Sequence, residues 1–229
     1  MRIEYHRTLL ADRTRNAAFH EALRRVVVKD KTTVADIGAG TGFLGFLAAK
    51  FGAKRVDFYE RADIAAVARK LLRHNKLTNC RIAEIHSTDV ATPDRVDVVV
   101  SETLGNYALE EDIIETMADA HRRHLKPGGV LIPSHISQFV APVTAPRFDA
   151  GLRAWDRATD GLTEIDLSPA KALTLNNIYV RPIAPGDLLA GARGAEWDRI
   201  ALGRDERSSR KGEASWPVAS DATIFGFAL

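Results

Sequence analysis

Apolar positions in the first 133 of the 229 residues follow two alternating patterns. Short apolar runs predict buried strands near residues 33–37, 55–59, 81–86, 97–101 and 129–132. Apolar residues at helical spacing predict helices near residues 12–28, 43–51, 63–75 and 112–124. Strands and helices that alternate in this way predict an α/β fold with a doubly wound parallel sheet. Ligands of such sheets lie at the carboxyl ends of the strands.

The pattern changes after Pro133, where prolines and tryptophans are scattered and short β-prone runs appear at 138–143 and 177–180. These runs predict a second, smaller β-rich module, a partial barrel. We therefore expect three parts: an N-terminal helical segment covering the ligand site (1–30), the ligand-binding sheet domain (31–133), and a β-rich module for substrate binding or dimerisation (134–229). Residues 223–229 are strand-like and stand at the end of the chain, so we expect this module to be truncated.

A glycine-rich loop joins the first predicted strand to the helix that follows it. Asp36 precedes the loop, and the glycines are Gly38, Gly40 and Gly42. Glycine tolerates positive φ and has no Cβ, so the backbone can approach a ligand, and the following helix N-terminus offers free N–H groups. The dinucleotide fingerprint needs a further glycine where this chain has Phe43, which disfavours a dinucleotide oxidoreductase.

An acidic residue closes the second predicted strand. Glu60 lies about 20 residues after the glycines, where an acid accepts both hydroxyls of an adenosine ribose. Asp89, just after the third strand, is placed to accept the adenine amino group. The alternative is that the glycines only make a tight turn, while Glu60 is a solvated strand end and Asp89 an exposed turn. With Asp36, the glycine loop and Glu60 resemble the class I S-adenosylmethionine-dependent methyltransferases, a Rossmann-like family; this implies S-adenosyl-L-methionine as cofactor and S-adenosyl-L-homocysteine as product.

Two carboxylates are expected beside the reactive methyl of that cofactor. Glu102 follows the fourth strand, and Glu111 follows a loop that contains Gly105. Unpaired, the two would repel and one would take up a proton, but a planar guanidinium can donate to both. The predicted catalytic pair therefore binds a guanidinium. In the alternative interpretation, Glu110 and Glu111 form the acidic first turn of the next helix and favour its dipole.

Ser101-Glu102-x-x-Gly105 followed by Glu111 resembles the double-glutamate loop of the protein arginine N-methyltransferases. The segment from His6 through Arg15 to Phe19 is similar to the N-terminal helix of that family, and residues 125–133 match as well. The resemblance implies that Arg15 binds the cofactor carboxylate and that His6 also contacts the cofactor. It further implies arginine in a protein or peptide as substrate, a reduced dimerisation arm within residues 153–177, and a homodimer.

The loop departs from the family pattern at three positions. Thr103, Leu104 and Asn106 stand where the family has Trp, Met and an aromatic residue, which leaves the fit of the acceptor open. One alternative is a small-molecule N-methyltransferase that acts on free arginine or another guanidine or amine metabolite. Another is a catalytically silent homologue that regulates an active enzyme.

Composition adds several exclusions. The chain has 32 Lys and Arg and 30 Asp and Glu, so its net charge does not favour binding to nucleic acid or to an anionic membrane. Cys80 is the only cysteine, which excludes an internal disulfide framework, and the seven histidines show no convergent metal spacing, so no metal is expected. No apolar run approaches the roughly 20 residues that span a bilayer. We expect a cytoplasmic protein.

Overall fold

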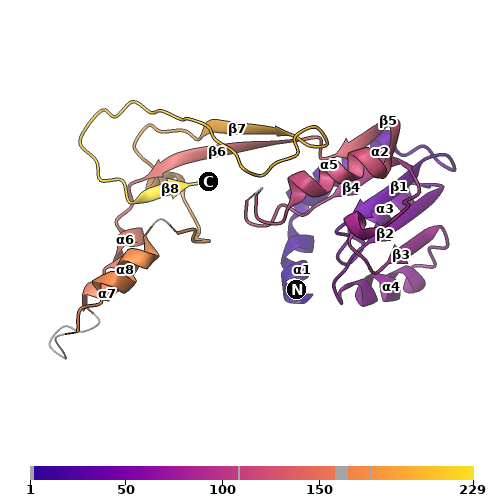
Figure 1. The fold of residues 1–229 in the computed structure, drawn as a ribbon, viewed down its shortest axis with the longest axis horizontal. Helices are drawn as coiled ribbons and strands as arrows, with labels where there is room; N and C mark the ends of the chain where they lie inside the picture. The colour runs from indigo at the N-terminus through magenta and orange to yellow at the C-terminus, as the bar shows by residue number, and fades with distance from the viewer. Residues whose placement is uncertain (1–2, 108, 158–164, 176) are drawn as a thin grey trace. The chain divides into compact units, whose positions relative to one another are not determined.

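The computed structural model describes residues 3–107, 109–157, 165–175 and 177–229, and the chain divides into two compact units. The first unit comprises Met1–Ile136 with Ile200–Ser209, and the second comprises Ser137–Arg199 with Arg210–Leu229. Figure 1 shows the helices and strands of both units.

The first unit contains a five-stranded parallel sheet of order β3-β2-β1-β4-β5, which confirms the predicted doubly wound fold. Its strands are β1 (Thr33–Ile37), β2 (Arg55–Tyr59), β3 (Cys80–Ala83), β4 (Val96–Ser101) and β5 (Leu125–Ile132). Its helices are α1 (Ile3–Ala11), α2 (Arg13–Val26), α3 (Phe43–Lys50), α4 (Ala65–His74) and α5 (Ile113–Arg123), with a short 3-10 helix η1 (Ser87–Asp89).

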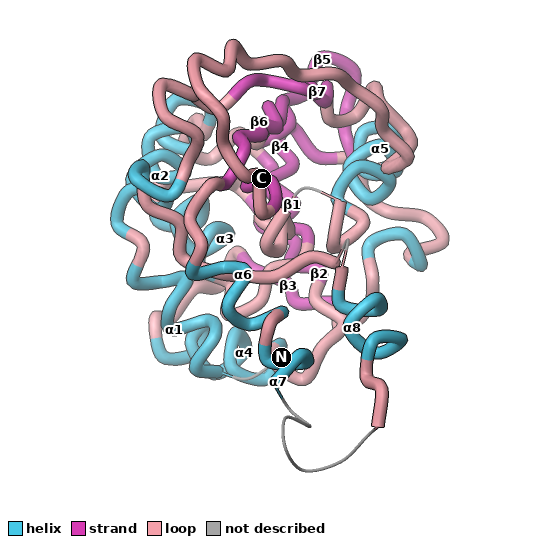
Figure 2. Tube along the Cα trace, turned by 90° about the vertical axis from the view of Figure 1, so that its left-hand side faces the viewer, coloured by secondary structure: helices cyan, strands magenta, loops and turns pink. Residues whose placement is uncertain are grey.

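Apolar clusters cover both faces of this sheet. On one face Val99 of β4 packs with Ile113 and Met117 of α5, and on the other Val98 packs with Leu23 of α2. Figure 2 shows α5 on one side of the strands and α2 and α3 on the other. Successive side chains of a strand point to opposite faces, so a strand with helices on both sides is expected to be mainly apolar. This is why β4 carries four valines, interrupted only by Asp97, whose carboxylate accepts hydrogen bonds from Thr33 and Lys126.

The structure has one helix more than the sequence predicted, and one strand that begins earlier. The helix predicted near 12–28 is α2, and α1 is a separate helix before it: Asp12 adopts an extended conformation and its carboxylate accepts a hydrogen bond from the Arg15 backbone N–H, which caps α2. The strand predicted near 129–132 begins earlier, at Leu125, so β5 includes Gly128, which has a φ of 76°, and its pairing with β4 shifts register. An edge strand tolerates a proline and such an irregularity, since one side of it needs no partner.

The second unit contains a small sheet of order β7-β6-β8. Its elements are β6 (His135–Val143), α6 (Arg147–Leu152), α7 (Ala154–Arg157), α8 (Ser168–Thr174), the 3-10 helix η2 (Pro185–Asp187), β7 (Ala195–Ala201) and β8 (Gly226–Ala228). The prediction of a strand at 177–180 is wrong: this stretch pairs with no strand. Of the segment predicted as a reduced arm, residues 158–164 and 176 lie outside the described residues.

Within the described ranges, every helix is too short or too polar to span a membrane.

Candidate functional site

A cavity of about 690 Å³ opens at the carboxyl ends of the strands of the first unit. Its walls come from α1, the start of α2, and the segments that follow β1, β2, β3 and β4. Nine of the ten residues predicted for the site line it: His6, Arg15, Asp36, Gly38, Gly40, Glu60, Asp89, Glu102 and Glu111. Most of the residues predicted for the site, although far apart along the chain, therefore line one cavity.

Gly42 is the exception, because it does not line the cavity. It adopts a φ of 86° directly before α3, and a Cβ there would lie 2.8 Å from the ring of Phe46. The third glycine of the loop thus allows the turn into α3 to pack closely against that helix, and we assign it no place at the ligand.

The first part of the loop is tied to β2. Gly38 and Ala39 both donate backbone hydrogen bonds to the carbonyl of Tyr59, at 2.9 and 3.1 Å. Gly40 donates to Oε2 of Glu60 at 2.8 Å. A Cβ on Gly40, whose φ is 56°, would lie 3.0 Å from the His6 ring, so glycine lets that ring close over the loop.

Glu60 is held at both oxygens. Oε2 accepts from Gly40 and Oε1 accepts from the Ala62 N–H, each at 2.8 Å. A carboxylate oxygen can accept two hydrogen bonds, so each keeps a lone pair for a further donor. The side chain is fixed in place and still able to accept a pair of hydroxyls.

Asp36 supports the loop from beneath. Its side chain is buried, with 1% exposed, and Oδ2 accepts from the Gly45 N–H of α3 at 2.8 Å. Burial raises its pKa to about 7, the Gly45 hydrogen bond lowers it, and the nearby charge of Glu60 raises it. Asp36 is therefore a buried acid that joins the end of β1 to the first turns of α3.

Arg15 and Glu102 form an ion pair in the cavity wall, each with a side chain only 19% exposed. The Nε of Arg15 is buried and has no hydrogen-bond partner among the described residues, and the same holds for Nε2 of His6. Burial lowers the pKa of His6, which favours its neutral form. Two buried polar groups without partners beside a cavity indicate that a ligand is to be bound there.

Glu110 and Glu111 precede α5 and do not form its first turn. The helix begins at Ile113 after Asp112, which has a left-handed φ of 53°, and the acid of its first turn is Glu115. The alternative interpretation of these two glutamates is therefore wrong.

The two neighbouring glutamates differ in their surroundings. Glu110 accepts hydrogen bonds from the backbone and side-chain nitrogens of Asn106, which closes the loop after β4. Burial, followed by the charges of Glu110, Glu102 and Glu60, raises the pKa of Glu111. A carboxylate in this position is stabilised by any cation that enters the cavity.

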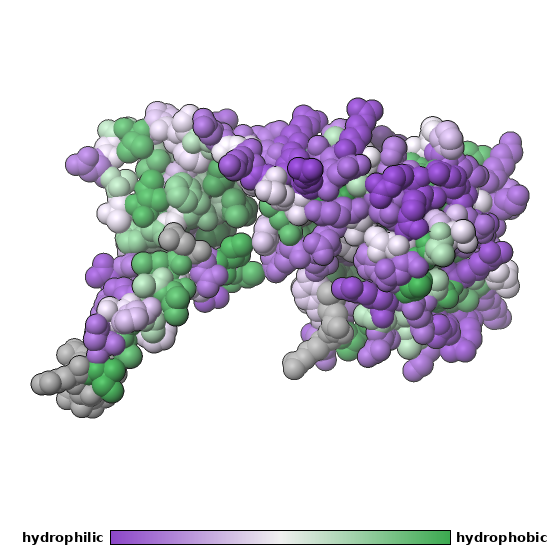
Figure 3. All heavy atoms as spheres, viewed as in Figure 1, coloured by the Kyte–Doolittle hydropathy of each residue, from purple (hydrophilic) through white to green (hydrophobic). Residues whose placement is uncertain are grey.

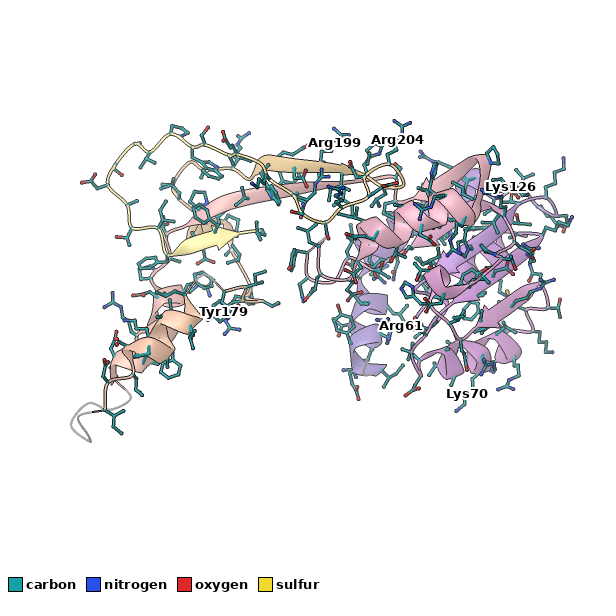
Figure 4. All side chains as sticks on the ribbon, viewed as in Figure 1. Arg61, Lys70, Lys126, Tyr179, Arg199 and Arg204 are labelled. Atoms are coloured by element: carbon teal, nitrogen blue, oxygen red, sulfur yellow. The ribbon has the colours of Figure 1, made fainter. Side chains whose placement is uncertain are left out.

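Several residues of the wall were missed from the sequence. Tyr5 lines the cavity, and burial and then the charges of the three glutamates raise the pKa of its phenol. Arg61, labelled in Figure 4, lines the cavity directly after Glu60 and forms no ion pair within the described part of the chain. His124 does not line the cavity; it is buried, and its Nδ1 has no hydrogen-bond partner among the described residues. No motif marks these residues, since their role depends on how distant segments pack.

Methyltransferases are similar to this chain in sequence. A family model described as ribosomal protein L11 methyltransferase (PrmA) matches residues 18–143. A probable protein arginine N-methyltransferase 6 of Arabidopsis thaliana is 34% identical over 155 residues, which are 66% of this chain and 35% of the relative. Protein arginine N-methyltransferase 2 of Dictyostelium discoideum is 31% identical over 192 residues, 78% of this chain and 36% of the relative. The chain thus spans well under half the length of these curated relatives.

Solved structures show the same fold. The Trypanosoma brucei PRMT1 enzyme-prozyme heterotetrameric complex with AdoHcy has a chain that superposes with a TM-score of 0.76 at 24% identity, covering 87% of this chain and 62% of that one. Protein arginine methyltransferase 10 of Arabidopsis thaliana, in an open conformation, has a TM-score of 0.72 at 25% identity, covering 90% of this chain and 64% of that one.

Proposed function

This chain belongs to the methyltransferase family whose model is described as ribosomal protein L11 methyltransferase (PrmA), and from this premise we propose that it is an S-adenosylmethionine-dependent N-methyltransferase acting on a guanidinium. The observation that carries the proposal is a single cavity that brings Glu60, Arg15, Glu102 and Glu111 together. The first two suit an adenosine cofactor with a terminal carboxylate, and the last two suit a planar cation. The arginine methyltransferase relatives support the same acceptor.

The residues present fit the cofactor. Glu60 retains acceptor capacity on both oxygens for the ribose hydroxyls, and Gly40 allows close backbone approach. Arg15 has an unpartnered Nε that can donate to a carboxylate, and the unpartnered Nε2 of His6 lies in the same wall. When bound, S-adenosylmethionine supplies an electrophilic methyl group on a sulfonium.

Glu102 and Glu111 would hold the acceptor. A guanidinium is planar, keeps its proton at cellular pH and has delocalised lone pairs, so its nitrogens are poor nucleophiles. Two carboxylates that accept from its remote nitrogens concentrate positive charge there and leave electron density on the nitrogen that is to be methylated. Burial and the neighbouring carboxylates raise the pKa of Glu111, and a cation bound beside it would favour its ionised form. The protein's contribution to such a transfer is to align the acceptor nitrogen with the methyl group and the sulfur.

The ion pair between Arg15 and Glu102 links the two halves of the site. Arg15 can face the cofactor carboxylate and Glu102 at the same time, because a guanidinium has five donors. In that arrangement Arg15 orients Glu102 towards the acceptor, and cofactor binding prepares the acceptor subsite. We propose that arginine within a protein or peptide is the acceptor, with free arginine or another small guanidine as the alternative.

A second candidate function is a catalytically silent partner of an active homologue. The fold neighbour from Trypanosoma brucei is an enzyme-prozyme complex, so methyltransferase-like chains do assemble with a partner of that kind. Methyl transfer by the isolated protein separates the two candidates, since a silent homologue binds S-adenosylhomocysteine without transferring methyl groups to any guanidine.

The proposal is tested by radiolabelled methyl transfer from S-adenosylmethionine into cell lysate, followed by separation of protein from small molecules. Label in the protein fraction, and in an arginine peptide but not in its lysine counterpart, is the expected result. Label only in small molecules selects the metabolite alternative. Absence of transfer from a preparation that binds S-adenosylhomocysteine contradicts the enzyme assignment and supports the silent partner.

We also propose that the protein is a cytoplasmic homodimer. Most large apolar side chains that are exposed belong to the second unit, among them Leu173 at 80% and Val180 at 63%. Figure 3 shows such apolar side chains over the elements of that unit. Exposed apolar area of this kind favours association, and light scattering that gives a monomer mass at micromolar concentration contradicts the dimer.

A further inference from the structure

The loop that follows β3 forms one wall of the cavity. Residues 85–89 all line it, and Ser87–Asp89 form the 3-10 helix η1. His86 closes the start of this turn, because its Nδ1 lies 2.7 Å from the Thr88 hydroxyl. Thr88 and Asp89 are exposed, so the packing of their side chains contributes little to holding this stretch in place. Residues 86–90 are called the β3 loop below.

One side chain from α5 joins three carbonyls of the β3 loop. Nη1 of Arg123 donates to the carbonyl of Val90 at 2.6 Å, and Nη2 donates to those of Thr88 and Ser87 at 2.9 and 3.1 Å. The guanidinium therefore fixes the shape of almost the whole loop from one point. Only arginine carries enough donors in a rigid plane to do this.

The guanidinium is itself held from α5. Nε of Arg123 donates to Oδ1 of Asp119 at 2.8 Å, and Nη2 donates to Oδ2 at 2.7 Å. This is a bidentate pair one helical turn apart, which sets both the position and the plane of the guanidinium. Asp119 thus directs the remaining donors of Arg123 at the β3 loop.

The next residue supports the same loop from inside the protein. His124 is completely buried, its Nε2 lies 3.0 Å from the Ser87 carbonyl, and its ring meets that of Tyr59 edge-on with centroids 5.1 Å apart. Ser87 is buried as well. The carbonyl of Ser87 is therefore held by two consecutive residues at the end of α5, and the β3 loop is anchored where it enters the core.

We propose that Arg123 is a positioning residue that fixes the β3 loop in the shape required to receive the adenosine end of the cofactor. The inference rests on the proposed function, because it takes this cavity as the cofactor site with Asp89 on the adenine side. Arg123 does not line the cavity and acts through the loop. Since α5 begins at Ile113, two residues after Glu111, a single helix would connect the adenosine wall with the acceptor wall.

The chain offers a matched control. Arg122 is the preceding residue of α5 and also pairs with Asp119, at 3.2 Å, but among the described residues its side chain forms no hydrogen bond or ion pair with the β3 loop. Arg123→Gln and Arg122→Gln remove the same charge from the same helix turn. Arg123→Lys serves as a milder variant, because a lysine keeps the charge and Asp119 pairing but cannot join three carbonyls.

Two measurements decide the proposal. Calorimetry with S-adenosylhomocysteine should show affinity lowered about 10-fold or more in Arg123→Gln, which corresponds to the loss of a preformed loop. Arg122→Gln should bind as the wild type does, and Arg123→Lys should fall between them. Hydrogen exchange without any ligand should be faster in residues 86–90 of Arg123→Gln than in Arg122→Gln. In kinetic assays, KM for the cofactor should rise while kcat at saturating cofactor and KM for the acceptor stay unchanged.

The possible failures are distinguishable. If the wild type does not bind S-adenosylhomocysteine, the proposed function is wrong. Equal hydrogen exchange of residues 86–90 in Arg123→Gln and Arg122→Gln would overturn the anchoring role of Arg123. Faster exchange in Arg123→Gln with wild-type cofactor affinity overturns the positioning role. A fall in kcat that is equal in Arg122→Gln and Arg123→Gln also overturns it, since general loss of stability would then explain both.

Discussion

Substitution of Asp36 by Asn should change how the stability of the protein depends on pH. The carboxyl group is fully buried at the end of β1, where the Gly45 N–H donates to it and Glu60 lies nearby. Burial raises its pKa from the ordinary 3.8 to about 7. The folded protein therefore binds this proton more tightly than the unfolded chain does, and the substitution removes the titration while keeping the shape of the side chain.

The magnitude follows from linkage. A pKa raised from 3.8 to about 7 is worth roughly 4 kcal/mol of stability. Because the folded pKa is the higher one, this contribution is fully present below pH 3.8, falls as the pH rises, and is lost above about pH 7. Ionised Asp36 keeps only the hydrogen bond from Gly45 as compensation within the described residues.

The assay is urea unfolding at about pH 5 and about pH 8, with the free energy of unfolding compared between Asp36→Asn and the wild type. From about pH 5 to about pH 8, the free energy of unfolding of Asp36→Asn should rise by about 3 kcal/mol relative to that of the wild type. Asp30→Asn, an exposed turn residue, serves as the control and should show no such gain. A difference between Asp36→Asn and wild type that is the same at both pH values would refute the reasoning.

Further predictions concern packing and cofactor binding. Gly45→Ala should lower the free energy of unfolding by about 1–3 kcal/mol, because a Cβ there would lie 2.4 Å from the buried ring of Phe58; an unchanged urea midpoint contradicts this. Glu60→Ala should weaken S-adenosylhomocysteine binding about 10-fold or more, since it removes the proposed ribose acceptor. Arg15→Ala should weaken binding of S-adenosylhomocysteine but not of adenosine, which lacks the carboxylate, and equal losses for both ligands by calorimetry would remove that role.

The sheet could be predicted because its strands carry their signal locally. The valine run of β4 and the glycine loop after β1 each define an element within a few residues, and alternation with helices then leaves a doubly wound sheet as the arrangement. Gly38, Glu60 and Glu102 were expected to lie together, because each follows a strand of the sheet and the carboxyl ends of parallel strands lie on the same side.

Other features depend on tertiary packing and could not be predicted from local patterns. The extended run at 177–180 has strand-like residues but no neighbouring strand to pair with. Gly42 looks identical to Gly40 in sequence, yet it faces Phe46 and not the cavity. The contacts of Arg123 join residues more than 30 positions apart, for which no sequence pattern exists.

The central claim is that Glu102 and Glu111 bind a guanidinium beside the cofactor, and single substitutions of both by glutamine test it most directly. Methyl transfer to an arginine peptide and binding of S-adenosylhomocysteine would be measured on the same preparations, with the surface variant Glu84→Gln as control. We expect each site variant to lose at least about 100-fold in turnover, because the acceptor loses a charged partner. Each should still bind S-adenosylhomocysteine; in Glu102→Gln, Arg15 also loses its ion pair, but it keeps its donors for the cofactor carboxylate. Turnover near the wild-type rate in either variant would contradict the account.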